Sequence, residues 1–171
     1  MHIEKIALLM GFLSFLGPVY SEPIEIGAKA PEISAIDQDG NRVNFADVYK
    51  KGITLVYFYP KADTPGCTAE ACSLRDSFAE LSQKGVQVLG VSTDKPEAQK
   101  KFKEKYHLPF TLIADSDRTV VKAFGVPTGA VVPVAARQSF LIKDGKVIWR
   151  DLKASTKEQA RDVLKVLETS K

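Results

Sequence analysis

Two runs of β-branched and aromatic residues stand out in the chain, at positions 53–59 and 86–91. Neither run alternates with polar residues, which is typical of strands that are buried on both faces. Pro60 ends the first run. Between the two runs the pattern becomes helical, and residues 67–83 are predicted to form one helix that ends at Gly85. The apolar positions of this helix recur every three or four residues, at Ala71, Leu74, Phe78 and Leu81.

The rest of the chain continues this alternation of helices and strands. A polar stretch over residues 27–39 leads to a turn signal at Asp39-Gly40. One short strand is predicted over residues 110–114. Four further helices are predicted, over residues 45–49 after a capping Asn44, 96–106, 118–124, and 157–168 after a capping Thr156.

A hairpin near the C-terminus completes the predicted sheet. Asp144-Gly145 is a two-residue turn signal between the apolar stretches 139–142 and 146–149. Strands that alternate with helices and end in a hairpin and a helix predict an α/β fold, with a central mixed sheet flanked by helices. A strand followed by a cysteine-bearing loop that opens a helix is the arrangement of the thioredoxin fold, so a thioredoxin-like fold is expected.

The first 21 residues are predicted to lie outside this fold. An uncharged apolar run over residues 6–17 follows Lys5. It is shorter than the roughly 20 residues that cross a bilayer as a helix, and it has the length of a signal-peptide core. We therefore expect residues 1–21 to be a signal peptide cleaved after Ser21, or an uncleaved membrane anchor, and residues 22–171 to form one domain. The protein would be exported, either periplasmic or secreted. A buried N-terminal helix is the alternative.

The composition excludes several classes of function. The 24 Lys and Arg residues against 21 Asp and Glu residues give a net charge of only +3, and no basic run is interleaved with aromatic residues. Nucleic acid is therefore not an expected partner. Two cysteines cannot form a four-thiolate zinc site, and the only histidines are His2 and His107. We expect neither a metal nor an organic cofactor.

Residues 60–72 carry the candidate chemistry. Cys67 follows a buried strand and lies in the first turn of the next helix, at the sheet edge where catalytic groups of open α/β folds gather. The free N–H groups and positive potential of a helix N-terminus favour a thiolate there. The preceding Thr64-Pro65-Gly66 is an unusual and rigid loop. The alternative is an inert cysteine that behaves as a small core residue.

Cys72 lies five residues further along the same predicted helix. Five helical residues rotate by about 140° and rise by about 7.5 Å, which places the two Cα atoms about 8.6 Å apart. A disulfide requires a separation below about 7 Å. Two interpretations remain open at this point: Cys72 is a core residue, or the start of the helix unwinds during a reaction.

Arg137 is the third candidate residue. It stands alone among the uncharged residues 131–142, where the chain enters a predicted strand. An arginine in such a segment is rarely buried without a partner. It either extends into solvent at the strand end or faces Cys67 across the sheet.

Taken together, Pro60-x-x-x-Thr64-x-x-Cys67 resembles the signature of the peroxiredoxins. The local sequence Thr-Pro-Gly-Cys, with a second cysteine five positions on, resembles the PrxQ subgroup, also called bacterioferritin comigratory proteins. The resemblance covers residues 24–169 and is carried further by three segments, 71–76, 110–115 and 137–142.

This resemblance implies a thiol peroxidase that reduces hydrogen peroxide and organic hydroperoxides without a cofactor. Cys67 would be the attacking sulfur and become a sulfenic acid, the reversible first stage of cysteine oxidation. Cys72 would then condense with it to an intramolecular disulfide, which a thioredoxin-type dithiol protein would reduce. A monomer is the expected state.

The resemblance also implies the residues of the peroxide pocket. Thr64 and Arg137 would hold the thiolate and the peroxide, and Pro60 would shield them from water. Glu70 corresponds to a position that orients the arginine. Cleavage of the O–O bond develops negative charge on the leaving oxygen, and donors such as Arg137 and Thr64 stabilise that charge more than they stabilise the ground state.

Two other functions are compatible with a thioredoxin-like fold. A disulfide oxidoreductase requires the closer C-x-x-C spacing. A redox-linked copper chaperone requires two cysteines separated by three residues and a histidine ligand, because copper(I) prefers soft thiolates. Here four residues separate Cys67 from Cys72, and His107 is the only histidine beyond the leader.

Overall fold

The structure is a computed structural model that describes residues 22–169, so the predicted leader and its cleavage site lie outside the described residues. Within 22–169 no helix has the length and apolar character needed to cross a membrane. The elements follow one another in the order β1 (Ser34–Ile36), β2 (Arg42–Asn44), α1 (Phe45–Tyr49), β3 (Ile53–Phe58), α2 (Pro65–Asp76), α3 (Phe78–Gln83), β4 (Val86–Ser92), α4 (Pro96–Tyr106), β5 (Thr111–Ala114), α5 (Thr119–Ala123), β6 (Gln138–Lys143), β7 (Lys146–Asp151) and α6 (Gln159–Thr169).

The predicted mixed sheet is confirmed. Five strands lie in the order β5-β4-β3-β6-β7, and β1 and β2 form a separate hairpin. β3, β4 and β5 run parallel to one another, whereas β6 and β7 are antiparallel to their neighbours. The carboxyl ends of the three parallel strands therefore meet at one edge of the sheet, where ligands of open α/β sheets bind.

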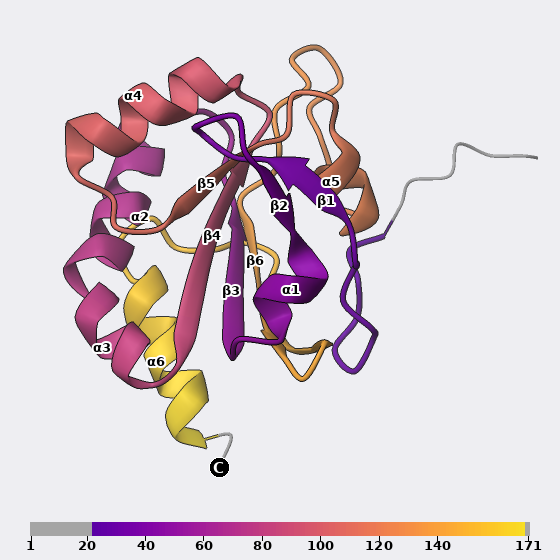
Figure 1. Ribbon diagram of the computed structural model, residues 1–171, viewed down its shortest axis with the longest axis vertical. Coiled ribbons are helices and arrows are strands. Elements are labelled where there is room, and N and C mark those ends of the chain that lie inside the picture. The colour runs from indigo at the N-terminus through magenta and orange to yellow at the C-terminus, as the bar shows by residue number, and fades with distance from the viewer. Residues whose placement is uncertain (1–21, 170–171) are drawn as a thin grey trace, which may run out of the picture.

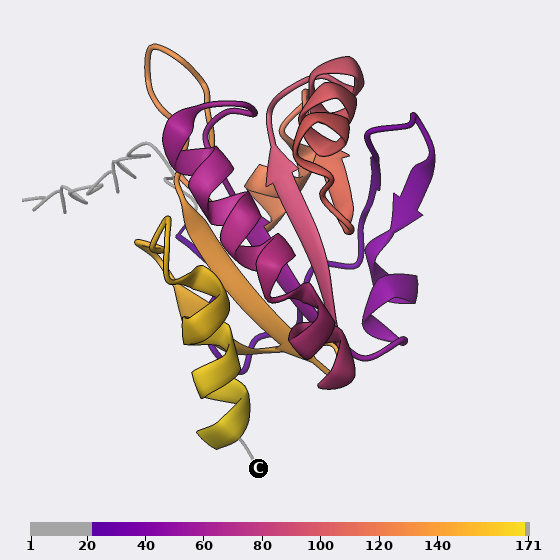
Figure 2. The same ribbon diagram turned by 90° about the vertical axis from the view of Figure 1, so that its left-hand side faces the viewer.

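Helices cover both faces of this sheet (Figures 1 and 2). On one face α2, α3, α4 and α6 pack over a core that contains Cys67, Tyr57 and Phe102. On the other face α1 and α5 pack over a second core built around Phe58 and Phe124. Each face of the central strands is thus buried, which explains why their sequences are apolar without alternation.

Most of the predicted elements are confirmed. The two long apolar runs form β3 and β4, and α4 has the predicted bounds. The hairpin of β6 and β7 turns at Asp144 and Gly145, with φ angles of +52° and +70°. Two consecutive residues with positive φ are what a tight two-residue hairpin turn requires. Asn44 caps α1, since its Oδ1 accepts hydrogen bonds from the N–H groups of Ala46 and Asp47.

Two predictions of local structure are wrong, and one pair of strands has no counterpart among the predicted elements. The single helix expected over residues 67–83 is two helices, because Ser77 leaves the helical conformation between α2 and α3. The hairpin of β1 and β2 was not predicted, because both strands have three residues and no fully buried one. At the last helix the Oγ of Ser155, rather than Thr156, accepts from the N–H groups of Lys157 and Glu158.

Gly90 in β4 makes room for the packing beneath the predicted reactive cysteine. It pairs with Tyr57 of β3. A Cβ atom on Gly90 would lie 2.7 Å from the Tyr57 hydroxyl oxygen and 2.8 Å from Leu112 Cδ2. The Tyr57 ring therefore occupies the space that a larger residue would fill, and it packs in the same core as Cys67.

We expect Gly90→Ala to lower the free energy of unfolding by about 1–3 kcal/mol, because the added methyl group overpacks the core. Urea denaturation followed by circular dichroism measures this change. The control is Gln83→Ala, an exposed position at the end of α3, which should stay within about 0.5 kcal/mol of the wild type. Equal stability of Gly90→Ala and the wild type would contradict the packing argument.

Candidate active site

Cys67 lies in the first turn of α2, and its side chain is only 1% exposed. Thr64 is the N-cap in extended conformation and Pro65 follows it, an arrangement that starts a helix firmly. The first turn, residues 65–68, has no carboxylate in its sequence. The positive end of the helix therefore lies beside the sulfur, and the nearest carboxyl in the sequence of α2 is that of Glu70.

Arg137 faces Cys67 rather than solvent. The register of β3 against β6 pairs Phe58 with Gln138, so Arg137 lies beyond the end of β3, beside the loop that leads to Cys67. Its Nη2 donates to Cys67 Sγ at 3.3 Å. The arginine side chain is 18% exposed, so its charge is poorly screened by water and acts strongly on the sulfur.

Glu70 holds the other side of the same guanidinium. It lies three residues after Cys67 in α2, on the same face of the helix. Its Oε2 accepts from Arg137 Nη1. The carboxyl is fully buried, and burial raises its pKa to about 8, against the opposing effect of the guanidinium. The structure thus brings Glu70 to the arginine, as the orienting position requires.

Thr64 and Pro60 lie on the loop between β3 and α2, and both are half-buried. The Thr64 hydroxyl donates to the carbonyl oxygen of Lys61 at 2.9 Å. Its proton is therefore directed into the loop, and its lone pairs remain to accept a hydrogen bond. The backbone carbonyl of Thr64 accepts from the N–H of Thr68 at 2.8 Å, which closes the first turn of α2 around Cys67.

Cys72 stays apart from Cys67. Both thiols are free, and both residues lie in the uninterrupted helix α2. Cys72 is half-buried, whereas Cys67 is buried. The next residue, Ser73, donates through its hydroxyl to the carbonyl of Lys157, which ties this part of α2 to the start of α6. The helical spacing thus keeps the two sulfur atoms from bonding in this conformation.

The structure gives a role to Gly66 and adds two site residues, Tyr57 and Asp94, to which the sequence did not point. A Cβ on Gly66 would lie 3.3 Å from Arg137 Nη2, so glycine leaves the guanidinium room to reach the sulfur. Tyr57 is fully buried in the core beneath Cys67. Asp94 accepts a hydrogen bond from the N–H of Ala62 at 2.8 Å. Only Asp94 had a usable signal, since it follows a strand at the catalytic edge of the sheet.

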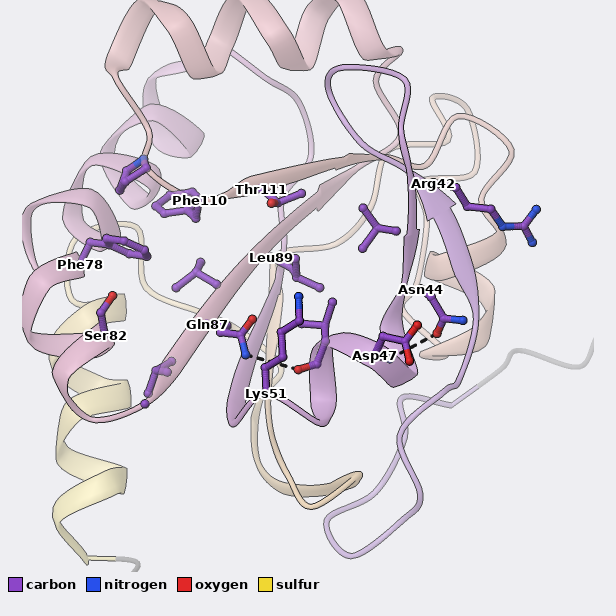
Figure 3. Close-up of a pocket in the computed structure, with 16 residues that line it drawn as sticks. Arg42, Asn44, Asp47, Lys51, Phe78, Ser82, Gln87, Leu89, Phe110 and Thr111 are labelled. Atoms are coloured by element: carbon purple, nitrogen blue, oxygen red, sulfur yellow. Dashed lines mark hydrogen bonds between the residues drawn. The ribbon is translucent and has the colours of Figure 1, made fainter.

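A cavity of about 770 Å³ opens elsewhere, among α1, β2, α3, β4 and β5. Figure 3 shows Lys51, Gln87 and Phe110 among the side chains around it. Neither the segment 60–72 nor Arg137 contributes to its lining. It is therefore separate from the cysteine site. Within residues 22–169, no three His, Cys, Asp or Glu side chains are grouped so that they could hold a metal ion.

The sequence matches the AhpC/TSA family over residues 26–150. Peroxiredoxin Bcp of Escherichia coli K12 is 48% identical over 141 residues, which cover 78% of this chain and 90% of the E. coli protein. The chloroplastic peroxiredoxin Q of Oryza sativa subsp. japonica is 39% identical over 122 residues, covering 71% of this chain and 56% of the plant protein.

Solved structures show the same fold. The crystal structure of peroxidoxin BcpB from Mycobacterium tuberculosis matches with a TM-score of 0.81 and 30% identity, over 86% of this chain and 99% of that one. Bacterioferritin comigratory protein of Xanthomonas campestris matches with a TM-score of 0.77 and 24% identity, over 85% and 99%. The thioredoxin-like fold is thereby confirmed. The chain belongs to the AhpC/TSA family of peroxiredoxins and, within it, to the Bcp/PrxQ subgroup of thiol peroxidases.

Proposed function

We propose that the protein is a two-cysteine peroxidase in which Cys67 attacks the peroxide and Cys72 resolves the product. The observation that carries this proposal is the contact between Arg137 Nη2 and Cys67 Sγ at 3.3 Å. It joins a buried sulfur at a helix N-terminus to a fixed cation, which is the environment of a reactive thiolate. Replacing Cys67 with serine should abolish the dithiol-dependent consumption of peroxide.

In the first step the Cys67 thiolate attacks one oxygen of the peroxide. The O–O bond breaks, a sulfenic acid forms at Cys67, and the second oxygen takes up a proton and leaves as water or an alcohol. Negative charge moves from the sulfur to the leaving oxygen. The Arg137 guanidinium stabilises that charge in a site where little solvent competes. The Thr64 hydroxyl, on the loop beside it, positions the peroxide through its lone pairs.

In the second step the Cys72 thiol attacks the sulfenic sulfur, and water leaves as the Cys67–Cys72 disulfide forms. An intact helix holds the two Cα atoms about 8.6 Å apart, beyond the limit of about 7 Å for a disulfide. The first turns of α2 must therefore unwind. Gly66, directly before Cys67, makes this unwinding easier, because glycine populates many backbone conformations.

In the third step a thioredoxin-type dithiol protein reduces the disulfide, becomes oxidised itself and returns both thiols. The substrates we propose are hydrogen peroxide and organic hydroperoxides. The reported alkyl peroxide reduction activity of the X. campestris relative supports the second class. We also propose that the protein acts as a monomer and without a bound cofactor, because the first two steps use only its own two sulfur atoms and the third uses those of the reducing protein.

Export remains a proposal that rests on the apolar run at residues 6–17. We expect Glu22 to be the first residue of the mature protein. Mass spectrometry of the protein isolated from its own host measures this directly. A dominant full-length soluble form in the cytosol would contradict export, and a full-length form in the membrane fraction would favour the uncleaved anchor.

Arg137→Lys should lower the second-order rate constant with peroxide about tenfold or more, because lysine lacks the planar pair of donors. Lysine retains the positive charge beside Glu70, so the fold should be kept. Stopped-flow kinetics under single-turnover conditions measures the rate. Arg161→Lys on the exposed part of α6 is the matched control, and an unchanged rate in Arg137→Lys would show that the guanidinium has no role.

Cys72→Ser should still consume one equivalent of peroxide rapidly, because the first step needs only the groups around Cys67. The sulfenic acid should then persist and react with dimedone, and turnover with a thioredoxin-type dithiol should fall strongly. In the wild type, amide exchange across residues 68–76 should rise on oxidation and recover on reduction. If Cys72→Ser turns over as fast as the wild type, or if the amides of residues 68–76 stay equally protected after oxidation, the resolving role and the unwinding are ruled out.

A further inference from the structure

The loop that carries Pro60 and Thr64 is anchored from outside the cysteine site. Asp94, which follows β4, accepts through Oδ2 from the backbone N–H of Ala62 at 2.8 Å. The same oxygen accepts from the Ser92 hydroxyl at 2.7 Å. A carboxylate oxygen that accepts two hydrogen bonds is held in direction by both, so it fixes the middle of the loop to the end of the neighbouring strand.

A buried glutamine holds the other end of this anchor. Gln99 of α4 is fully buried, and its Nε2 donates to Ser92 Oγ at 2.9 Å and to the carbonyl of Ile113 at 2.8 Å. Its Oε1 accepts from the hydroxyl of Tyr59, the residue before Pro60. Because all the amide hydrogens and the acceptor of Gln99 are engaged, the network has one arrangement rather than several.

A second anchor lies at the surface and is weaker. Asp63 accepts from Lys105 Nζ at 2.8 Å and from the Tyr106 hydroxyl at 2.7 Å. These groups are exposed, so water and salt screen the interaction and it holds the loop only weakly. The backbone of Asp63 has a φ of +58°, a conformation that an aspartate tolerates at some cost. The loop is therefore bent sharply just after the amide that Asp94 holds.

We propose that Asp94 is a positioning residue for the peroxide step, which holds Ala62 so that Pro60 and Thr64 stay in place around Cys67. The assignment rests on the proposed function in one respect, namely that Cys67 is the attacking sulfur. It goes beyond that function because it gives Asp94, which follows β4, and the buried Gln99 of α4 a part in positioning the cysteine site. It also predicts that the unwinding is confined to residues after Thr64, since the loop before them is tied to the end of β4 and to α4.

The geometry explains why a residue that touches neither sulfur nor peroxide affects the reaction. Residues 61–63 belong to no strand or helix, so side-chain contacts contribute strongly to fixing this part of the loop. A displacement of reacting groups by about 1 Å can lower a rate about 100-fold. Loss of the bond to the Ala62 N–H frees the loop to move by distances of that order.

The test compares Asp94→Ala, Asp94→Asn and the control Asp117→Ala. Asp117 also accepts from a backbone N–H, that of Thr119 at 3.0 Å, but it lies before α5 on the other face of the sheet. We expect the single-turnover rate with hydrogen peroxide to fall about tenfold or more in Asp94→Ala. Asp94→Asn keeps an oxygen acceptor for Ala62 and should react at close to the wild-type rate, as should the control.

Two further readouts separate positioning from a general loss of structure. Amide exchange at residues 61–63 should rise in Asp94→Ala, while β4 stays protected. Alkylation of Cys67 by iodoacetamide should keep its wild-type rate, because the thiolate depends on Arg137 and the start of α2 rather than on the loop. A fall in both the peroxide and the alkylation rates would instead show general damage and overturn the proposal.

The remaining outcomes are also decisive. A wild-type peroxide rate in Asp94→Ala, or unchanged exchange at Ala62, would overturn the positioning role. Should Asp94→Ala not fold, Ser92→Ala provides a second form of the test. It removes the hydroxyl that orients Asp94 and accepts from Gln99 Nε2, and the same changes in rate and exchange are expected. Cys67→Ser is measured alongside: if it still reduces peroxide, the proposed function fails independently of Asp94.

Discussion

The site depends on one guanidinium, largely shielded from solvent, that is held between two acidic groups. The Arg137 guanidinium donates to the Cys67 sulfur and to the Glu70 carboxylate, and little of it reaches solvent. A charged group shielded from water lowers stability unless partners compensate it. Removing Cys67 or Glu70 would therefore leave one side of the Arg137 guanidinium unpaired. The strand register that places Arg137 beyond the end of β3 therefore also brings its charge to the Cys67 sulfur.

The same helix serves two opposed requirements. The proposed reaction with peroxide uses the intact N-terminus of α2, whose free N–H groups lie beside Cys67. The proposed disulfide needs that turn to open. Ala71 and Leu74 are fully buried, and Ser73 is bonded to the start of α6, so opening exposes apolar surface and costs free energy. The closed state is therefore favoured until a covalent bond offsets that cost.

Local pattern accounts for most of the secondary structure. The two central strands and α4 were predictable because their periodicity extends over six or more residues. The β1–β2 hairpin was missed because a three-residue, partly exposed strand has no periodicity to detect. The break at Ser77 was also missed, since the apolar positions continue at helical spacing through it and only the packing of α3 against β4 decides where the chain bends.

The sequence by itself determined that Cys67 lies where a buried strand passes into a helix, and that a helical Cys72 is too far away to bond. Both conclusions depend only on local geometry. Tertiary structure decided that Arg137 faces Cys67 rather than solvent and that Glu70 accepts a hydrogen bond from it. It also decided that Asp94 accepts from the Ala62 amide. Those partners are 32 to 70 residues apart, and they meet because strand order and register bring them together, which no local pattern encodes.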